Sequence, residues 1–361
     1  MTSSRSPDGT AAPSQPDPLP APPPPLWDGY CADPFVLRAD DGRYVMYGTT
    51  PLALPDGRAF QVLVSDDLDA WEDVGGALVV PEPAPEGAEY WAPEVAYADG
   101  RYWMYYSRGI RDAAHQIRVA VSRNATGPFE DTGDVLTSDL PFAIDPSPYR
   151  DPSGSWWLFY ATDLVEGDRP GTVLVVQRLG EMTHLEGPRT VVLRASADWQ
   201  RYERGRRMYG AVHDWHTLEG PAVLDSGDGG CVLLYSGGNW QTPGYGVAVA
   251  RAPGPEGPWH EDPDEGPVVT SASTGLVGPG HCSVLPDERG GYHLFLHAWS
   301  QDAPRRRPHR LALRVQEGRV AVELPTSSTV STGTQRVDPQ SGRPPTSGEG
   351  RTRREEGDGH A

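Results

Sequence analysis

One unit of sequence recurs five times along this chain, and no other feature restricts its fold as strongly. In each copy, an acidic residue or a histidine lies beside Pro or Gly at the start of an apolar run, and a turn and an aromatic-rich strand follow. Repeats of several short strands with a period of roughly 50–75 residues are typical of β-propellers. The residues at the start of the five runs are Asp33, Glu94, Asp145, Glu219 and His281.

The repeat continues beyond this hairpin. A third strand follows in each copy, in FQVLVSDD, HQIRVAVSRN, TVLVVQRL, YGVAVARAP and HRLALRVQ. Four of these alternate apolar and polar residues, as half-buried strands do, whereas TVLVVQRL predicts a strand buried on both faces. Short acidic stretches such as DAWEDVG indicate an outer fourth strand. We therefore expect an all-β, five-bladed β-propeller with about four antiparallel strands per blade, and a loop or helical turn at 201–220.

Composition divides the chain into three parts. Residues 1–26 are rich in Pro, Ser and Ala, which favours a disordered or polyproline arm. The repeats predict one catalytic propeller domain at 27–324. Residues 325–361 lack apolar periodicity and predict a disordered tail.

The charge of the chain excludes several functions. The net charge is −19 and there is no Lys, which excludes Schiff-base lysine chemistry and a Walker-type phosphate loop. The acidic balance argues against a nucleic-acid partner, and the basic run 305–310 (RRRPHR) is interpreted as a solvated loop. No apolar run reaches membrane length and no signal peptide is visible, so we expect a cytoplasmic protein without a membrane partner. Cys31, Cys231 and Cys282 lack metal-binding spacing, and we expect Cys31 and Cys282 to be buried thiols.

Convergence of the innermost strands would bring several carboxylates together at the central channel. Like charges in proximity cost free energy, so such a cluster points to chemistry. A cluster of carboxylates in a channel is suited to metal binding or to glycoside hydrolysis. An inverting glycosidase needs a carboxylic acid and a carboxylate about 6.5–9.5 Å apart, with room for a water between them. Residues on different blades could meet this spacing, whereas neighbours on one strand could not.

The motifs around these residues carry a family resemblance. Asp33 in ADPFV, Asp145 in IDPSPY and Glu219 in LEGPAV, with WAPEV and GPGHCSV in order between and after them, resemble glycoside hydrolase family 43 over about residues 30–320. The resemblance implies a five-bladed propeller and an inverting α-L-arabinofuranosidase, arabinanase or β-xylosidase. It also implies that Asp33 is the general base, that Glu219 is the general acid, and that Asp145 tunes and orients the acid.

Further residues take their expected roles from the resemblance or from their place in the repeat. His281 matches a channel histidine near a calcium ion or water cluster, although a hydrogen-bonded channel residue is an equal interpretation. Arg310 matches a family arginine that contacts the sugar and the carboxylates. We expect Trp91 and Trp240 to border the sugar pocket, and Glu94 to be structural. No cofactor is expected beyond a possible structural calcium ion.

Three functions remain open. The first is an inverting glycosidase that releases terminal α-L-arabinofuranosyl or β-D-xylosyl units from plant-derived oligosaccharides. The second is an invertase-like retaining fructosidase; Arg150-Asp151-Pro152 resembles a motif of that family, but its position predicts a hairpin turn, and the family's Cys after Glu219 is absent. The third is a non-catalytic carbohydrate-binding propeller, which the presence of all three carboxylates disfavours.

Overall fold

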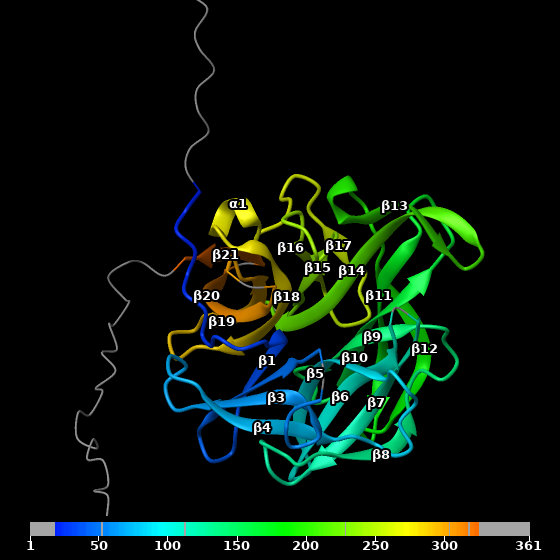
Figure 1. Ribbon diagram of the computed structural model, residues 1–361. Helices are drawn as coiled ribbons and strands as arrows, with labels where there is room; N and C mark the ends of the chain where they lie inside the picture. The colour runs from blue at the N-terminus through cyan, green and yellow to red at the C-terminus, as the bar shows by residue number, and fades with distance from the viewer. Residues whose placement is uncertain are drawn as a thin grey trace, which may run out of the picture. The chain divides into compact units, whose positions relative to one another are not determined.

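The structure, a computed structural model, describes residues 19–324 apart from 52, 112, 228, 303 and 317. Strands dominate these residues (Figure 1). The expected tail at 325–361 and the first 18 residues of the expected arm lie outside the described residues. The rest of that arm contacts the fifth blade: Leu26 N donates to Pro308 O at 2.8 Å, and His309 Nδ1 lies 3.1 Å from the carbonyl oxygen of the buried Pro23.

Five groups of four antiparallel strands follow one another along the chain, and a short parallel pairing of β11 with β14 joins the third and fourth groups into one sheet that also contains β13. The first two blades contain β1 (Ala32–Arg38), β2 (Tyr44–Thr49), β3 (Arg58–Ser65) and β4 (Glu72–Val79), then β5 (Glu89–Ala98), β6 (Arg101–Ile110), β7 (Ala113–Ser122) and β8 (Glu130–Val135). The third contains β9 (Ala143–Arg150), β10 (Trp156–Leu164), β11 (Gly171–Gly180) and β12 (His184–Leu193). The last two contain β14 (Ala211–Asp225), β15 (Cys231–Gly237), β16 (Gly246–Ala252) and β17 (His260–Glu261), then β18 (Val277–Pro286), β19 (Tyr292–Trp299), β20 (Arg306–Gln316) and β21 (Arg319–Glu323).

The apolar core is divided among the interfaces between blades. Each of five clusters of buried side chains joins two neighbouring blades, and the cluster containing Met46, Leu63 and Phe295 joins the first blade to the fifth. Alternation along a strand explains this division: Met104 and Tyr106 of β6 face the first blade, whereas Tyr105 faces the third. The innermost strands contact one another in the order β1, β5, β9, β14, β18 and back to β1. Their starts therefore gather on one face of the ring.

The apolar strand β11 is buried on both faces, as its sequence predicts. Val173 and Val175 pack toward the second blade, and Leu174 and Val176 pack toward the fourth. A polar or bulky substitution on either face of β11 would therefore disturb an interface between blades. All three cysteines, Cys31, Cys231 and Cys282, are buried free thiols, as expected for the two beside the channel.

The expectation of a loop or helical turn at 201–220 is wrong. After a short 3₁₀ helix, η1 (Asp198–Gln200), the chain forms β13 (Arg201–Met208), which pairs antiparallel with the first part of β14. The turn residues Tyr209 and Gly210 have φ of 51° and 79°, the left-handed conformations of a type I′ hairpin. One turn of helix, α1 (Ser271–Thr274), precedes the fifth blade. No helix within the described residues is long and apolar enough to span a membrane.

Candidate active site

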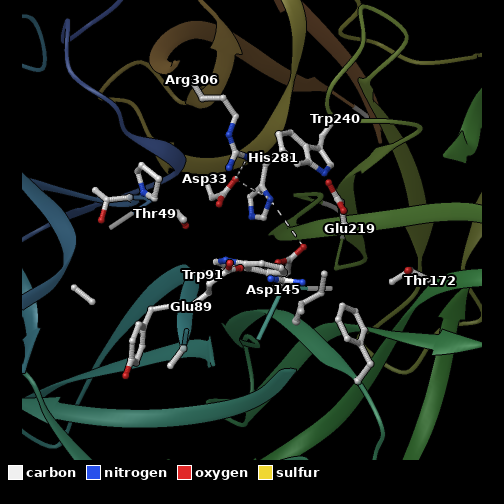
Figure 2. A pocket seen from close by; sticks show the side chains of 18 of the residues that line it. Asp33, Thr49, Glu89, Trp91, Asp145, Thr172, Glu219, Trp240, His281 and Arg306 are labelled. Carbon is white, nitrogen blue, oxygen red and sulfur yellow. Dashed lines mark hydrogen bonds and ion pairs between the residues drawn. The ribbon is translucent and has the colours of Figure 1, made fainter. Parts of the chain in front are cut away.

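A cavity of about 620 Å³ opens where the innermost strands begin. Every blade contributes to its lining, and Figure 2 shows the side chains of Asp33, Asp145, Glu219 and His281 pointing toward a common space. Other lining residues come from the loop at 80–89, from the β13–β14 hairpin, and from Tyr30, Arg111, Trp240 and Arg306. The cavity is within the size range of small-molecule sites. It brings together three of the predicted site carboxylates from three different blades.

Each innermost strand carries an irregularity at the cavity. The pairing with the second strand shifts register there in all five blades, and one residue at each shift has a positive φ. These residues are Asp33 (51°), Ala92 (48°), Asp145 (57°), Gly220 (55°) and His281 (48°). Positive φ strains residues other than glycine, and bulges re-aim side chains near functional sites. The repeated irregularity turns these backbone positions toward the cavity.

This register corrects the predicted equivalence of the five first-strand residues. Asp33, Asp145 and His281 share one structural position, but the second blade has Ala92 there and the fourth has Gly220. Glu219 precedes the shared position by one residue and still reaches the cavity. Glu94 follows it by two residues and is absent from the cavity lining; its neighbours include Ser147 and Cys282. Burial raises the pKa of Glu94 to about 8, so this carboxyl is largely neutral at neutral pH.

Asp33 is held in its ionised form. Burial opposes the charge, but His281, Arg306 and His297 together lower the pKa of this carboxyl well below its usual range. Its Oδ1 lies 3.2 Å from Arg306 Nη1, 3.2 Å from His297 Nδ1 and 3.4 Å from His281 Nδ1. A carboxylate of low pKa that faces a cavity stays ionised throughout the neutral range and can hold a water molecule by accepting its hydrogen bond.

Asp145 is bonded to the backbone beside Glu219. Gly220 N donates to Asp145 Oδ2 at 3.0 Å, which links the third blade to the residue that follows Glu219. Burial, and then the charges of Glu219 and Asp33, raise the pKa of Asp145 well above its usual range. Asp145 therefore resists ionisation while Glu219 and Asp33 are charged, and protons are distributed over a coupled group of carboxyls.

Glu219 has the properties of a proton donor. Burial and the charge of Asp33 raise its pKa to about 7, against the opposing effects of a Tyr245 hydrogen bond and of Arg306. The Tyr245 hydroxyl donates to Glu219 Oε1 at 2.6 Å. Near neutral pH a large fraction of Glu219 is therefore protonated, whereas Asp33 is ionised. One cavity thus holds an acid and a base at the same pH.

His281 lies among these carboxyls, but the surroundings do not fit a calcium ion held by side chains. Calcium takes six to eight oxygen ligands. His281 Nδ1 lies 3.4 Å from Asp33 and 3.9 Å from Asp145, and the guanidinium of Arg306 already contacts Asp33. Among the described residues, no group of three or more His, Cys, Asp or Glu side chains is placed to share a metal ion. His281 lies beside both carboxyls, with Nδ1 nearer to Asp33 than to Asp145.

The prediction for Arg310 is wrong, and Arg306 takes its place. Arg310 donates to Leu68 O and to Asp69, and does not line the cavity. Arg306 begins β20 opposite Trp299 and points into the cavity with 13% of its side chain exposed. Four residues along a strand correspond to about 13 Å, so Arg310 is carried away from the cavity. The basic run 305–310 is therefore mostly strand, and not a solvated loop.

Trp91 and Trp240 both line the cavity, as expected of residues that border the pocket. Trp91 stacks on His115 with ring centroids 3.7 Å apart. Trp240 packs against Trp299 at 5.8 Å, and the Arg306 guanidinium lies 4.6 Å from its ring centroid. Figure 2 shows Trp240 beside Arg306 and Glu219. Both rings are fixed by aromatic or cationic neighbours and could present a face to a sugar.

The β13–β14 hairpin supplies cavity residues that the sequence interpretation missed. Tyr202, Arg206, Met208 and Trp215 all line the cavity. Tyr209 at the hairpin tip donates to Asp163 Oδ2 at 2.7 Å, which ties the hairpin to the third blade. The sequence signal was the Tyr-Gly pair, a less common version of the Asn-Gly type I′ turn.

Asp151, in the motif shared with invertase-like propellers, lies in a turn outside the cavity lining. Its Oδ1 accepts hydrogen bonds from Ser155 N at 2.9 Å and from the Ser153 hydroxyl at 2.6 Å. The hairpin interpretation of Arg150-Asp151-Pro152 is confirmed, and this motif gives no support to a fructosidase.

The model of the family described as glycosyl hydrolases family 43 matches residues 23–316. The chain belongs to this family. An extracellular endo-α-(1→5)-L-arabinanase of Thermotoga petrophila is 26% identical to this family-43 chain, over 73% of the chain and 64% of the relative. An extracellular exo-α-(1→5)-L-arabinofuranosidase of Streptomyces avermitilis is 24% identical, over 74% of the chain and 54% of the relative. The chain thus spans less than two thirds of the length of either relative.

Solved structures agree with the family assignment. A thermostable family-43 glycoside hydrolase is 27% identical with a TM-score of 0.69, covering 82% of this chain and 93% of the other. An endo-1,4-β-xylanase of Bacteroides thetaiotaomicron is 26% identical with a TM-score of 0.66, covering 82% and 96%. The predicted family and the five-bladed propeller are confirmed. The predicted cytoplasmic location is wrong, because the names of these two arabinan-active relatives describe extracellular enzymes.

Proposed function

We propose that this family-43 chain is an inverting glycosidase that removes terminal α-L-arabinofuranosyl units from arabinan-type or arabinose-substituted oligosaccharides. The observation that carries the proposal is the opposite protonation of two carboxyls in one cavity. The pKa of Asp33 is held well below its usual range, and the pKa of Glu219 is raised to about 7. Paired titratable groups whose environments separate their pKa values are the mark of an acid and a base.

The reaction would follow from these states. Asp33 accepts a proton from a water that attacks the anomeric carbon, and Glu219 donates its proton to the departing glycosidic oxygen. Asp145 holds the backbone beside Glu219 through Gly220 N, and its carboxyl competes with Glu219 for protons. Arg306 keeps Asp33 ionised. Water attacks from the side opposite the departing oxygen, so the released sugar has the inverted anomeric configuration.

Cavity shape and relatives support terminal release of arabinofuranose. The β13–β14 hairpin and the loop before β5 both contribute residues to the cavity, and we expect these two segments to limit its length. The two relatives named above act on α-(1→5)-L-arabinan linkages according to their names, one from chain ends and one internally. A terminal β-D-xylosyl unit is the competing substrate.

A panel of nitrophenyl glycosides, followed by linear arabino-oligosaccharides, tests the proposal. We expect turnover of α-L-arabinofuranoside, release of arabinose alone, and inverted first product in proton NMR. Retained configuration would contradict the role of Asp33 and favour a fructosidase-like retaining mechanism. Internal cleavage products would indicate endo-action. Preferential turnover of the xyloside would show that the substrate sugar is β-D-xylose. Binding without turnover would indicate a carbohydrate-binding propeller.

A further inference from the structure

Two buried hydroxyl groups, those of Ser236 and Tyr245, lie between the fifth blade and Glu219. His281 N donates to Ser236 Oγ at 2.7 Å, and Ser236 lies on β15 without solvent exposure. The Ser236 side chain lies beside the phenol of Tyr245, the residue before β16. Tyr245 donates to Glu219 Oε1 at 2.6 Å. None of these contacts involves Asp33 or Asp145.

The hydrogen bond from Tyr245 distinguishes the two oxygens of Glu219. A phenol has a single proton, and Tyr245 gives this proton to Glu219 Oε1. Oε1 is therefore the acceptor oxygen of Glu219, and the acidic proton belongs on Oε2. The structure gives Oε2 no hydrogen bond to any described residue, while Glu219 lines the cavity.

The Tyr245 ring is fixed in place. Only 1% of the residue is exposed, and the ring stacks on His297 with centroids 6.1 Å apart and an interplanar angle of 12°. A Cβ at Gly280 would lie 2.1 Å from the ring, so the glycine beside His281 makes room for it. His297 Nδ1 in turn accepts from Asp33 N at 3.1 Å. Tyr245, which contacts Glu219, thus packs against His297, which contacts Asp33.

We propose that Tyr245 is a positioning residue that directs the acidic proton of Glu219 to Oε2, the oxygen free to meet the departing glycosidic oxygen. This inference rests on the proposed function, in which Glu219 is the general acid. The titratable and charged groups around Glu219 are Asp33, Asp145, Arg306, His281 and Tyr245. Replacing Tyr245 by Phe changes none of the charges, so its effect separates hydrogen bonding from charge.

The test compares Tyr245→Phe with the unaltered protein on arabinofuranosides with poor and good leaving groups. Loss of a hydrogen bond to a carboxylate disfavours its ionised form, so the alkaline limb of the kcat profile should rise by about one pH unit. For poor leaving groups kcat should fall about tenfold at its plateau, because the proton is no longer directed. The loss should shrink to less than about twofold for dinitrophenyl glycosides, and KM should change little.

Two further variants make the test specific. Tyr235→Phe removes another buried phenol, which donates to Glu261 outside the cavity lining, and should leave both the pH profile and the leaving-group dependence unchanged. Ser236→Ala removes the hydroxyl beside the Tyr245 phenol and should give a smaller loss in the same direction. Thermal unfolding checks all three variants, and Ser236→Ala carries the test if Tyr245→Phe does not fold.

The proposal is overturned if Tyr245→Phe and Ser236→Ala leave the alkaline limb in place and reduce activity equally for both leaving-group classes, since packing alone would do that. A separate variant, Glu219→Gln, tests the underlying function. If Glu219→Gln keeps full activity on poor leaving groups, Glu219 is not the acid and the proposed function fails. If Glu219→Gln loses activity only on substrates with poor leaving groups, while Tyr245→Phe behaves as the unaltered protein does, only the positioning role of Tyr245 is wrong.

Discussion

The charge of Arg306 should set the acidic limit of activity through Asp33. Arg306 Nη1 lies 3.2 Å from Asp33 Oδ1, and the two side chains are only 13% and 7% exposed. Burial lowers the pKa of both neighbouring histidines, that of His297 to about 4, so neither carries much charge at neutral pH. Of these three neighbours, Arg306 is therefore the one that keeps a full positive charge.

Coulomb's law bounds the effect of removing this charge. At 3.2 Å, an effective dielectric constant of about 20 gives about 5 kcal/mol, and the value for water gives about 1 kcal/mol. These limits correspond to about 1 to 4 pKa units. In Arg306→Gln, the pKa of Asp33 should rise by at least about one unit. The acidic limb of the kcat/KM profile should therefore move to higher pH by a similar amount. The loss of activity should therefore grow as the pH is lowered.

The control is Arg306→Lys, which keeps the charge but loses the planar contact with Trp240 and the hydrogen bond to Tyr30. We expect it to weaken substrate binding while moving the acidic limb much less than Arg306→Gln does. Circular dichroism and thermal unfolding identify folding defects, because Asp33 loses a buried partner. An acidic limb that stays in place in Arg306→Gln, or moves equally in Arg306→Lys, would refute the electrostatic reasoning.

Two further predictions concern the neighbouring carboxyls. Asp145→Asn removes a carboxyl that shares protons with Glu219 but keeps an acceptor for Gly220 N. The second ionisation of the coupled pair is then lost, so the alkaline limb should move to lower pH; an unmoved limb with uniformly lower activity would restrict Asp145 to positioning. Glu94→Gln tests the effect of Glu94 on stability. The pKa of Glu94 is about 8 in the folded protein and about 4.3 in the unfolded chain. Between these values the unfolded chain loses the proton first, so the stability of the wild type decreases as pH rises. The melting temperature of Glu94→Gln should therefore match wild type near pH 4, exceed it increasingly up to about pH 8, and stay parallel above; a constant difference across this range would argue against a neutral buried Glu94.

The fold could be predicted from the sequence because its information is local and repeated. Alternating strands and hairpin turns recur in every unit, and a strand that faces two blades, such as β11, reveals this by continuous apolarity. Asp33, Asp145 and Glu219 could also be selected, since each lies at the start of an apolar run in an innermost strand, within a recognisable motif. A ring of blades brings strand starts together whatever the details of each loop.

The tertiary structure alone decided which other side chains reach these carboxyls. The bulge at each strand start separates Glu219 from Glu94, because a shift of one or two residues changes where a side chain points. Arg306 and Arg310 belong to the same basic run, and only the register of β20 against β19 shows that Arg306 enters the cavity. Tyr245 and Ser236 meet Glu219 across strands of the fourth blade. Periodicity predicts the face of a strand, whereas these contacts depend on how the strands are aligned in three dimensions, which no local pattern records.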